Sequence, residues 1–412
     1  MESVNQVLTY IFLFIALYFE VFLLITYFES NKSKLGVSKL IRPAKLPTVS
    51  IIVPVWNEEA TILKTVFSLL KLDYPKDKLQ IFIVDDGSTD KTWSVLQRFK
   101  RNKQIILLQK ENGGKHTALN YALTFIRSDL VGCLDADSFV HPQTLNRIID
   151  KFEENKEVMA VTPSVKVHEP KTIIQLIQKV EYGWGILLRN LFAKLSALYV
   201  TPGPFSIFKR EVFLTLGGYR KAHNTEDMEL ALRMQTYGFK IDNAPDAWVY
   251  TVAPEKISTL YKQRLRWTYG FLKNIIDYKH MFFKPQYGHL GMIILPAASF
   301  STVSSIYLLL NMFGSWIMEI WDRFIEIKTV GLVWNWPKFE LFYFDTGIIA
   351  LMSMFAFVLT ITLLLFSRKM AEGSMRFGRD FVYFVAIYAI ISPLWIGKAF
   401  YNVVFARNTK WR

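Results

Sequence analysis

The sequence predicts an α/β protein in which a mostly parallel sheet is flanked by transmembrane helices. Between residues 46 and 255, short β-branched runs alternate with runs that repeat apolar residues at helical spacing. Long apolar runs with few charges lie on both sides of that block. Of the 412 residues, 51% are hydrophobic and 20% are charged, which excludes an intrinsically disordered chain. The single cysteine, Cys133, excludes a disulfide framework and a cysteine-based zinc site.

The first expected element is a membrane helix in residues 1–30. Residues 7–28 carry one ionisable group, Glu20, and as a helix they would be roughly 33 Å long, enough to cross a bilayer core of about 30 Å. A cleaved signal peptide is the alternative, but it would begin with positive charge, and Glu2 is acidic.

The linker 31–47 is basic. Its five bases are Lys32, Lys34, Lys39, Arg42 and Lys45. By the positive-inside rule, the domain that follows then lies in the cytoplasm. These bases also account for part of the net charge of +14, which would otherwise suggest binding to nucleic acid.

Residues 48–256 are expected to fold as one cytoplasmic domain. The expected strands are residues 49–54, 79–84, 105–108 and 130–134, and the expected helices are residues 61–70, 92–100 and 117–126. This alternation indicates parallel strands with helices on both faces of the sheet. In such sheets ligands bind beyond the carboxyl ends of the strands. Three of the expected strands end in polar clusters: Asn57-Glu58, Asp85-Asp86 and Asp135-Ala136-Asp137.

Two of these clusters are pairs of carboxylates. Asp135 and Asp137 can reach one cation together, and Mg²⁺ or Mn²⁺ often binds through one or two carboxylates plus substrate phosphates. Asp-x-Asp is also common in loops that hold no metal. Asp85 and Asp86 could accept hydrogen bonds from a base or a ribose, or could form a turn that caps the next helix.

Two further clusters precede expected helices. Gly113-Gly114-Lys115 combines glycines, a lysine and a helix N-terminus, which suits a phosphate or a nucleotide edge, although it is neither a P-loop nor a dinucleotide fingerprint. Glu226 and Asp227 precede the helix-like residues 228–236. Asp227 could act as a general base at the edge of a cleft. Both acids could instead simply favour a helix N-terminus.

Residues 257–287 are expected to form an amphipathic interfacial region. It contains the run Gln263-Arg264-Leu265-Arg266-Trp267. Arg266 offers a charge-assisted fork to a diphosphate, and Trp267 offers a flat surface on which a sugar ring can stack. The alternative is a helix that only places Arg and Trp among lipid headgroups.

Residues 288–412 are expected to hold further membrane segments. The apolar stretches are residues 288–320, 341–366 and 381–405. The connection 321–340 is near neutral and 367–379 is basic, which places the first outside and the second in the cytoplasm. Three simple spans would leave the C-terminus outside, yet the tail is basic: it carries Arg407, Lys410 and Arg412. Either Pro393 marks a re-entrant or broken segment, or the first stretch is not one simple span.

The order and spacing of these clusters closely resemble those of the membrane-bound processive family 2 glycosyltransferases. That group includes bacterial poly-N-acetylglucosamine synthases, chitin-oligosaccharide synthases and cellulose synthases. The matching runs are Val53–Glu58, Asp85–Asp90, Gly114–Asn120, Asp135–Asp137, Thr225–Asp227 and Gln263–Trp267. The resemblance covers about residues 46–280 and the apolar segments on both sides.

The resemblance implies a GT-A fold, a UDP-sugar donor and an inverting displacement that makes a β-linkage with the help of Mg²⁺ or Mn²⁺. By motif match, Asp227 would be the catalytic base, and Asp135 and Asp137 would hold the metal and the diphosphate. The residues implied in substrate binding are Asn57, Glu58, Asp85, Asp86, Lys115, Asp135, Glu226, Gln263, Arg266 and Trp267. The implied partners are the growing glycan, the lipid bilayer of the plasma or inner membrane and a small accessory membrane subunit, with no nucleic acid.

Within this group the resemblance favours synthesis of poly-N-acetylglucosamine from UDP-N-acetylglucosamine. Thr225-Glu226-Asp227 stands where hyaluronan synthases carry Gly-Asp-Asp, and no regulatory domain of the cellulose-synthase kind is expected after the last apolar segment. A membrane glycosyltransferase that adds one sugar to a lipid or short glycan would use the same motifs and is the alternative. A non-enzymatic membrane protein that retains the fold is a third hypothesis, which the intact carboxylates oppose.

Overall fold

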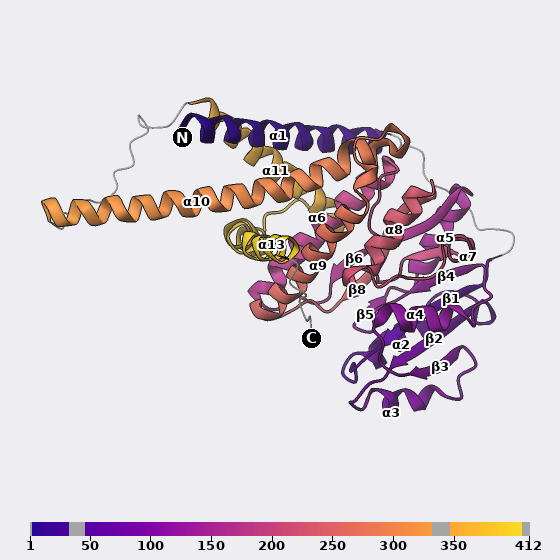
Figure 1. The fold of residues 1–412 in the computed structure, drawn as a ribbon. Coiled ribbons are helices and arrows are strands. Elements are labelled where there is room, and N and C mark those ends of the chain that lie inside the picture. Colours follow the sequence, from indigo (N-terminus) through magenta and orange to yellow (C-terminus); the bar gives the residue numbers. More distant parts are fainter. Residues whose placement is uncertain (1, 33–45, 332–346, 406–412) are drawn as a thin grey trace.

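The computed structural model describes residues 2–32, 46–331 and 347–405. An α/β domain lies at one end of the molecule, and three long helices extend from it side by side (Figure 1). These are α1 (Glu2–Lys32), α10 (Leu295–Val330) and α11 (Ile348–Glu372). Most of the basic linker 31–47, the end of the connection 321–340 and the basic tail lie outside the described residues.

The sheet of the α/β domain has eight strands in the order β3-β2-β1-β4-β7-β6-β8-β5. The strands are β1 (Val49–Val55), β2 (Leu79–Asp86), β3 (Ile105–Lys110), β4 (Leu130–Cys133), β5 (Ser138–Val140), β6 (Val158–Val167), β7 (Ile207–Lys209) and β8 (Lys240–Thr251). β1 to β4 pair in parallel, as do β6 and β8, whereas β7 is antiparallel to both of its neighbours and β5 is antiparallel to β8. The expected mostly parallel α/β sheet is confirmed.

The helices of this domain cover both faces of the sheet. They are α2 (Ile62–Leu70), α3 (Thr92–Leu96), α4 (Lys115–Leu123), α5 (Thr144–Glu154), α6 (Ile173–Lys194), α7 (Arg210–Leu216) and α8 (Glu226–Thr236). Along the central strands, Ile51 and Ile81 join the same apolar cluster as α2, whereas Ile52 and Phe82 join the cluster that contains α4. Successive strand residues point to opposite faces, so both faces are apolar.

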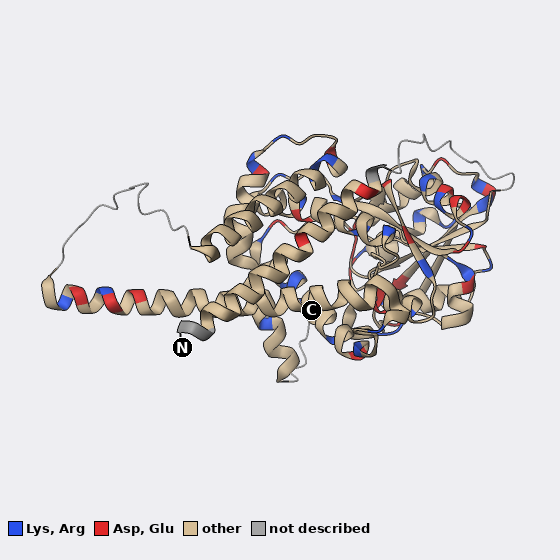
Figure 2. Cartoon of the chain, turned by 90° about the horizontal axis from the view of Figure 1, so that it is seen from above, with Lys and Arg blue, Asp and Glu red and all other residues tan. Residues whose placement is uncertain are grey.

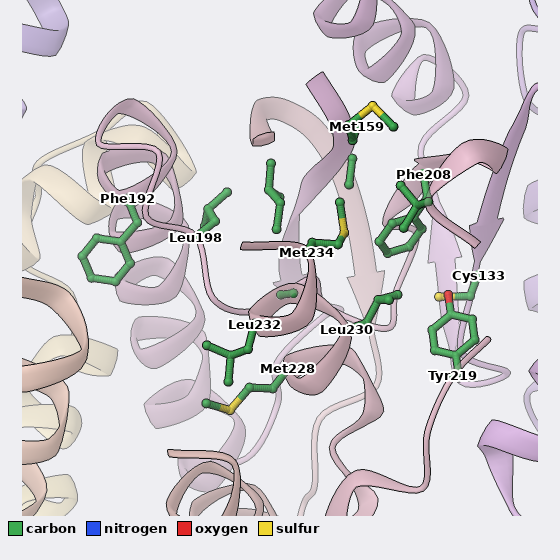
Figure 3. Packing of buried hydrophobic residues seen from close by; sticks show 14 of the residues in the cluster. Cys133, Met159, Phe192, Leu198, Phe208, Tyr219, Met228, Leu230, Leu232 and Met234 are labelled. Carbon is green, nitrogen blue, oxygen red and sulfur yellow. The ribbon is translucent and has the colours of Figure 1, made fainter. Parts of the chain in front are cut away.

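The helix α8 is anchored from within. Its Met228, Leu230, Leu232 and Met234 are buried in one cluster that reaches β4 (Figure 3). Each such side chain contributes roughly 1.5–3 kcal/mol through burial. The helix therefore holds its first turn, with Glu226 and Asp227, at a fixed place beside the sheet.

The helices α1, α10 and α11 are each long and apolar enough to cross a membrane. They pack through aromatic contacts: the rings of Tyr27 and Phe366 stack with centroids 4.4 Å apart, and those of Phe12 and Tyr307 lie 4.8 Å apart. Figure 2 shows that charged residues gather on the α/β domain and on the loop after α11, and are sparse along these helices except towards the far end of α10.

The last apolar segment is one continuous helical stretch. It consists of α12 (Arg379–Tyr383), a π-helical turn at Phe384–Tyr388 and α13 (Ala389–Val404), with Pro393 inside the helix. Of the expectation that Pro393 marks a re-entrant or broken segment, the break is wrong, because the helix continues through this residue. The whole stretch Arg379–Val404 is also long and apolar enough to span a membrane, but α13 runs across the direction of α1 and α10 (Figures 1 and 2).

Candidate active site

The helix α9 (Ile257–Asp277) links the α/β domain to the long helices and carries the Gln263–Trp267 run. α13 lies along it: Trp395 and Ala399 pack against Leu265 and Tyr269. The region expected to be an amphipathic helix is therefore covered on one side by the crosswise C-terminal helix.

Asp86 organises the loop between β3 and α4. Its carboxylate accepts hydrogen bonds from Lys110 Nζ at 2.7 Å, from the Gly113 backbone N–H at 3.1 Å and from the Gly114 backbone N–H at 2.8 Å. The expected strand stopped at residue 84, but β2 continues through Asp86 because it pairs with Lys110 on β3. Asp86 is thus buried and already hydrogen-bonded on both oxygens.

Asp85 and Asn57 occupy the same edge of the sheet. The Asp85 carboxylate accepts hydrogen bonds from Gln109 Nε2 at 3.0 Å and from the Ser88 backbone N–H at 3.3 Å. Asn57, which has a φ of 55°, accepts a hydrogen bond from the Thr89 backbone N–H at 2.8 Å. The side chain expected beside it, Glu58, accepts a hydrogen bond from Thr61 Oγ1 at 2.7 Å. These contacts tie the loops after β1 and β2 together.

Lys115 brings three of the predicted clusters to one point. Its Nζ lies 2.8 Å from Asp135 Oδ1 and 3.0 Å from Glu226 Oε1. Burial by itself would lower the pKa of Lys115, but Asp135 and Glu226 raise it well above its usual value. Lys115 and Glu226 are the first residues of α4 and α8, each two residues earlier than the expected helix starts.

The backbone of Gly203 lies close to this lysine. A Cβ atom on Gly203 would lie 2.8 Å from Lys115 Nζ and 2.9 Å from Asp135 Oδ2. A side chain at this position would therefore push the ends of Lys115 and Asp135 out of their places. The same turn is fixed to the other acids because Thr201 Oγ1 donates a hydrogen bond to the Asp227 carbonyl at 2.8 Å.

The other carboxylates of the cluster, Asp137, Asp227 and Glu226, lie close to other acids and are shielded from solvent. Burial, followed by the charge of Asp135, raises the pKa of Asp137 to about 6. Burial, followed by the charge of Glu226, raises the pKa of Asp227 to about 6. For Glu226, burial is outweighed by Lys115, so its pKa is lowered. A buried carboxylate with a pKa near neutrality can take up a proton during a reaction.

The carboxylates suit a cation that arrives with its own oxygen ligands. Among the described residues, no group of three or more His, Cys, Asp or Glu side chains is arranged to hold a metal. Asp135 and Asp137 supply two hard oxygen donors, and the repulsion that raises the pKa of Asp137 is what a divalent cation would relieve. Mg²⁺ and Mn²⁺ are commonly bound by one or two carboxylates plus phosphate oxygens and water. The donor set therefore fits a metal–diphosphate.

α9 is held against the turn that carries Glu226 and Asp227. Asn274 Nδ2 donates a hydrogen bond to Thr225 Oγ1 at 2.9 Å, and a Cβ atom on Gly270 would collide with the same threonine. Arg266 lies close enough to help lower the pKa of Glu226. The side chain of Trp267 remains 37% exposed. Of the predicted residues on α9, Arg266 is thus near enough for its charge to act on the acidic cluster.

Three residues beside the site have no role that the sequence patterns predict. Arg264 is almost fully buried and forms an ion pair with Glu181 of α6, to which the Tyr388 hydroxyl also donates a hydrogen bond. In the sequence, the sign that could have indicated this contact is Glu181 itself, because it is an acidic residue among the mostly apolar residues of α6. Its partners lie 83 and 207 residues away, and no local pattern shows such contacts.

Part of the chain is similar in sequence to known proteins. Residues 50–217 match the family model described as Glycosyl transferase family 2. The chain is 30% identical over 224 residues to a poly-beta-1,6-N-acetyl-D-glucosamine synthase of Staphylococcus epidermidis, with 54% of each chain covered. It is 30% identical over 228 residues, 55% of each chain, to the synthase of the same name from Staphylococcus aureus strain COL. The chain thus spans about half the length of the curated relatives that it matches.

One solved structure matches nearly the whole chain. It is the mannosyltransferase PcManGT from Pyrobaculum calidifontis in complex with GDP-Man and Mn²⁺, which matches over 99% of both chains with a TM-score of 0.67 and 19% sequence identity. This similarity shows the fold, and it confirms the expected GT-A type of domain with long helices beside it. The part of the chain that matches the glycosyl transferase family 2 model is thus set among helices that are long and apolar enough to cross a membrane.

Proposed function

We propose that this protein is an inverting, divalent-metal-dependent glycosyltransferase that polymerises a β-linked glycan from UDP-N-acetylglucosamine. The observation that carries the proposal is the convergence of Asp135, Lys115 and Glu226 within 3.0 Å contacts, beside Asp227 and against α9. The names of the staphylococcal relatives supply the donor sugar and the polymer. The Mn²⁺ in the mannosyltransferase complex supports the metal.

In the proposed reaction, the acceptor hydroxyl attacks the anomeric carbon of the donor, and the bond from that carbon to UDP breaks. Asp227 accepts the proton of the hydroxyl, a role for which its raised pKa suits it. Asp135 and Asp137 would hold a metal whose charge stabilises the leaving diphosphate. Lys115 and Arg266 add positive charge on the same side. Asn57, Glu58, Asp85 and Asp86 form the nucleotide side, and Gln263 and Trp267 bind the acceptor.

The proposed membrane arrangement has three crossings, by α1, α10 and α11. Residues 48–256 are then the cytoplasmic catalytic domain and residues 257–287 the interfacial region. α11 ends against this domain, where Glu372 pairs with Lys179 of α6 at 2.8 Å. The crosswise α13 would stay at the cytoplasmic side, which agrees with the basic tail in the sequence. The growing glycan would leave between the membrane helices, and an accessory membrane subunit would bind to their lipid-facing sides.

Topology can be tested with single cysteines, because the natural Cys133 is buried. In intact cells, a membrane-impermeant thiol reagent should label Val330→Cys, at the far end of α10, but not Phe405→Cys, after α13; both positions are exposed. Labelling of both would mean that α13 crosses the membrane.

The activity test is product analysis. Membranes that contain the protein are incubated with labelled UDP-N-acetylglucosamine and Mg²⁺ or Mn²⁺, and the product is sized and hydrolysed. A ladder or a long polymer of N-acetylglucosamine supports the proposal. A product with a single sugar on a lipid or short glycan would select the single-transfer alternative. UDP binding without turnover of any sugar nucleotide would reject both and leave a non-enzymatic protein.

A further inference from the structure

Arg264 sits in the middle of the Gln263–Trp267 run but does not face the acidic cluster. It is 3% exposed. Its guanidinium donates to both oxygens of Glu181, from Nε to Oε1 at 2.7 Å and from Nη2 to Oε2 at 2.6 Å. This two-point fork holds the guanidinium in a single plane and a single orientation.

The same guanidinium touches two residues assigned to the acceptor. Nη1 donates a hydrogen bond to Gln263 Oε1 at 2.5 Å. The guanidinium carbon lies 4.2 Å from the centroid of the Trp267 ring, at stacking distance. An indole ring has two faces, and Arg264 covers one of them. The opposite face is the one left for a sugar ring.

The anchor of this arrangement reaches beyond the catalytic domain. Glu181 belongs to α6, and its Oε1 also accepts a hydrogen bond from the Tyr388 hydroxyl at 3.0 Å. Tyr388 ends the π-helical turn before α13. One partly buried carboxylate therefore joins α6, α9 and the C-terminal helical stretch.

A role in folding alone does not account for this chemistry. A buried ion pair must overcome the loss of hydration of both charges, and apolar residues of similar size often stabilise a core as well or better. What an apolar pair cannot do is fix the angle of a neighbouring ring and the direction of an amide. The ion pair provides both for Trp267 and Gln263.

We propose that Arg264 is a positioning residue for the acceptor: held by Glu181, it sets the amide of Gln263 and leaves a single face of Trp267 open for the acceptor sugar. This inference rests on the proposed function. In this proposal the orientation of the acceptor-binding side chains depends on the contact between α6 and α9. The hydrogen bond from Tyr388, in the C-terminal helical stretch, adds a weaker support.

The test compares Arg264→Lys with a matched control, Arg233→Lys. Arg233 forms an ion pair with Glu229 at 3.0 Å that is even more deeply buried, but it touches no residue of the Gln263–Trp267 run. UDP release by the purified full chain is measured with UDP-N-acetylglucosamine, with and without a soluble oligosaccharide of β-linked N-acetylglucosamine. Thermal unfolding of each variant reports the folded fraction.

We expect Arg264→Lys to raise the KM for the oligosaccharide by about 10-fold, because lysine can neither form the two-point contact with Glu181 nor stack a flat group on Trp267. The KM for the UDP-sugar and the release of UDP without acceptor should stay near the wild-type values. Glu181→Gln should act in the same way, and Tyr388→Phe should act in the same direction by about 2-fold, since it removes one hydrogen bond. Arg233→Lys should leave the acceptor KM unchanged.

An unchanged acceptor KM in folded Arg264→Lys and Glu181→Gln protein would overturn the positioning role. The same would follow if Arg233→Lys shifted the acceptor KM as much, because the effect would then be general to buried pairs. Wild-type protein that releases no UDP under any condition would instead remove the proposed function and, with it, the acceptor on which this inference rests.

Discussion

The proposed site has two ends: the nucleotide end, with Asp85 and Asp86, and the reacting end, with Asp137 and Asp227. They differ in what surrounds their carboxylates. At the nucleotide end, Asp85 and Asp86 are buried, and each oxygen is already hydrogen-bonded by the protein itself. At the reacting end, burial and neighbouring acids raise the pKa values of Asp137 and Asp227 to about 6, and Lys115 is the one cation that bridges two of the acids.

This difference indicates what each end needs from a ligand. At the nucleotide end the carboxylates already have hydrogen-bond partners within the protein, and Asp86 holds the Gly113–Gly114 loop in place. The reacting end carries uncompensated negative charge that a metal, a proton or a cationic side chain must balance. Substitutions at the reacting end should therefore change chemistry and metal dependence, whereas those at the nucleotide end should change loop order and stability.

The largest effect is expected from Asp227→Asn. Because the amide cannot accept the proton of the acceptor hydroxyl, transfer should fall by about 10²–10⁴-fold, while UDP binding, measured by calorimetry, should persist. Asp246→Asn, an exposed carboxylate on β8, serves as the control and should keep full activity. Transfer that survives in Asp227→Asn would remove Asp227 as the base.

Asp135→Ala should abolish the part of UDP affinity that depends on Mg²⁺ or Mn²⁺. A loss of at least about 10-fold is expected in the presence of metal, since changes even behind a metal ligand commonly cost that much. Calorimetric titration of UDP with and without the metal gives the comparison. If the ratio of the two affinities matched that of the wild type, the metal would not be held by Asp135.

The pH profile tests the raised pKa of Asp227. A base must be deprotonated, so kcat/KM should fall about tenfold per pH unit below pH 6, whereas a carboxylate of ordinary pKa would keep activity down to about pH 4. The measurement is UDP release at saturating metal from pH 4.5 to 8. A profile that is flat between pH 5 and 7 would show that the reacting end is not crowded as described.

The smallest effect on turnover is expected from Lys110→Met at the nucleotide end. It removes one of three hydrogen bonds to Asp86, so the free energy of unfolding should fall by about 1.5–3 kcal/mol. Thermal unfolding measures this loss of stability. UDP affinity, measured by calorimetry, should weaken equally with and without metal. If the loss appeared only with metal, the division between the two ends would fail.

Much of the fold follows from local patterns. The β-branched runs near residues 51 and 81 predict buried strands because both faces of a parallel sheet are covered by helices. Asp135 and Asp137 come directly after β4, and parallel strands bring their carboxyl ends to one edge, so the placement of the acids follows as well. The alternation did not predict β5 to β8. β5 and β7 leave only three residues of pattern each, and β6 and β8 contain Pro163 and Pro245, which argue against a strand inside a sheet.

The contacts within the acidic cluster cannot be predicted from local sequence patterns. The sequence places Lys115, Asp135 and Glu226 in separate loops, and their order and spacing suggest a shared site by resemblance. That one amine lies within 3.0 Å of two carboxylates more than 90 residues apart depends on the packing of α4 and α8 on the sheet and on the close approach of Gly203. Such contacts arise from three-dimensional packing that no run of neighbouring residues encodes.

By itself, the sequence determined the α/β alternation, the apolar segments long enough for a membrane and the residue types that reach the edge of the sheet, because each depends on a period of two or 3.6 residues or on the length of a run. Only the tertiary structure decided that Arg264 of α9 is buried against Glu181, that the charge of Arg266 acts on Glu226, and that α13 lies across the other long helices. Those outcomes depend on which faces of distant helices meet, and that is set by packing over the whole chain.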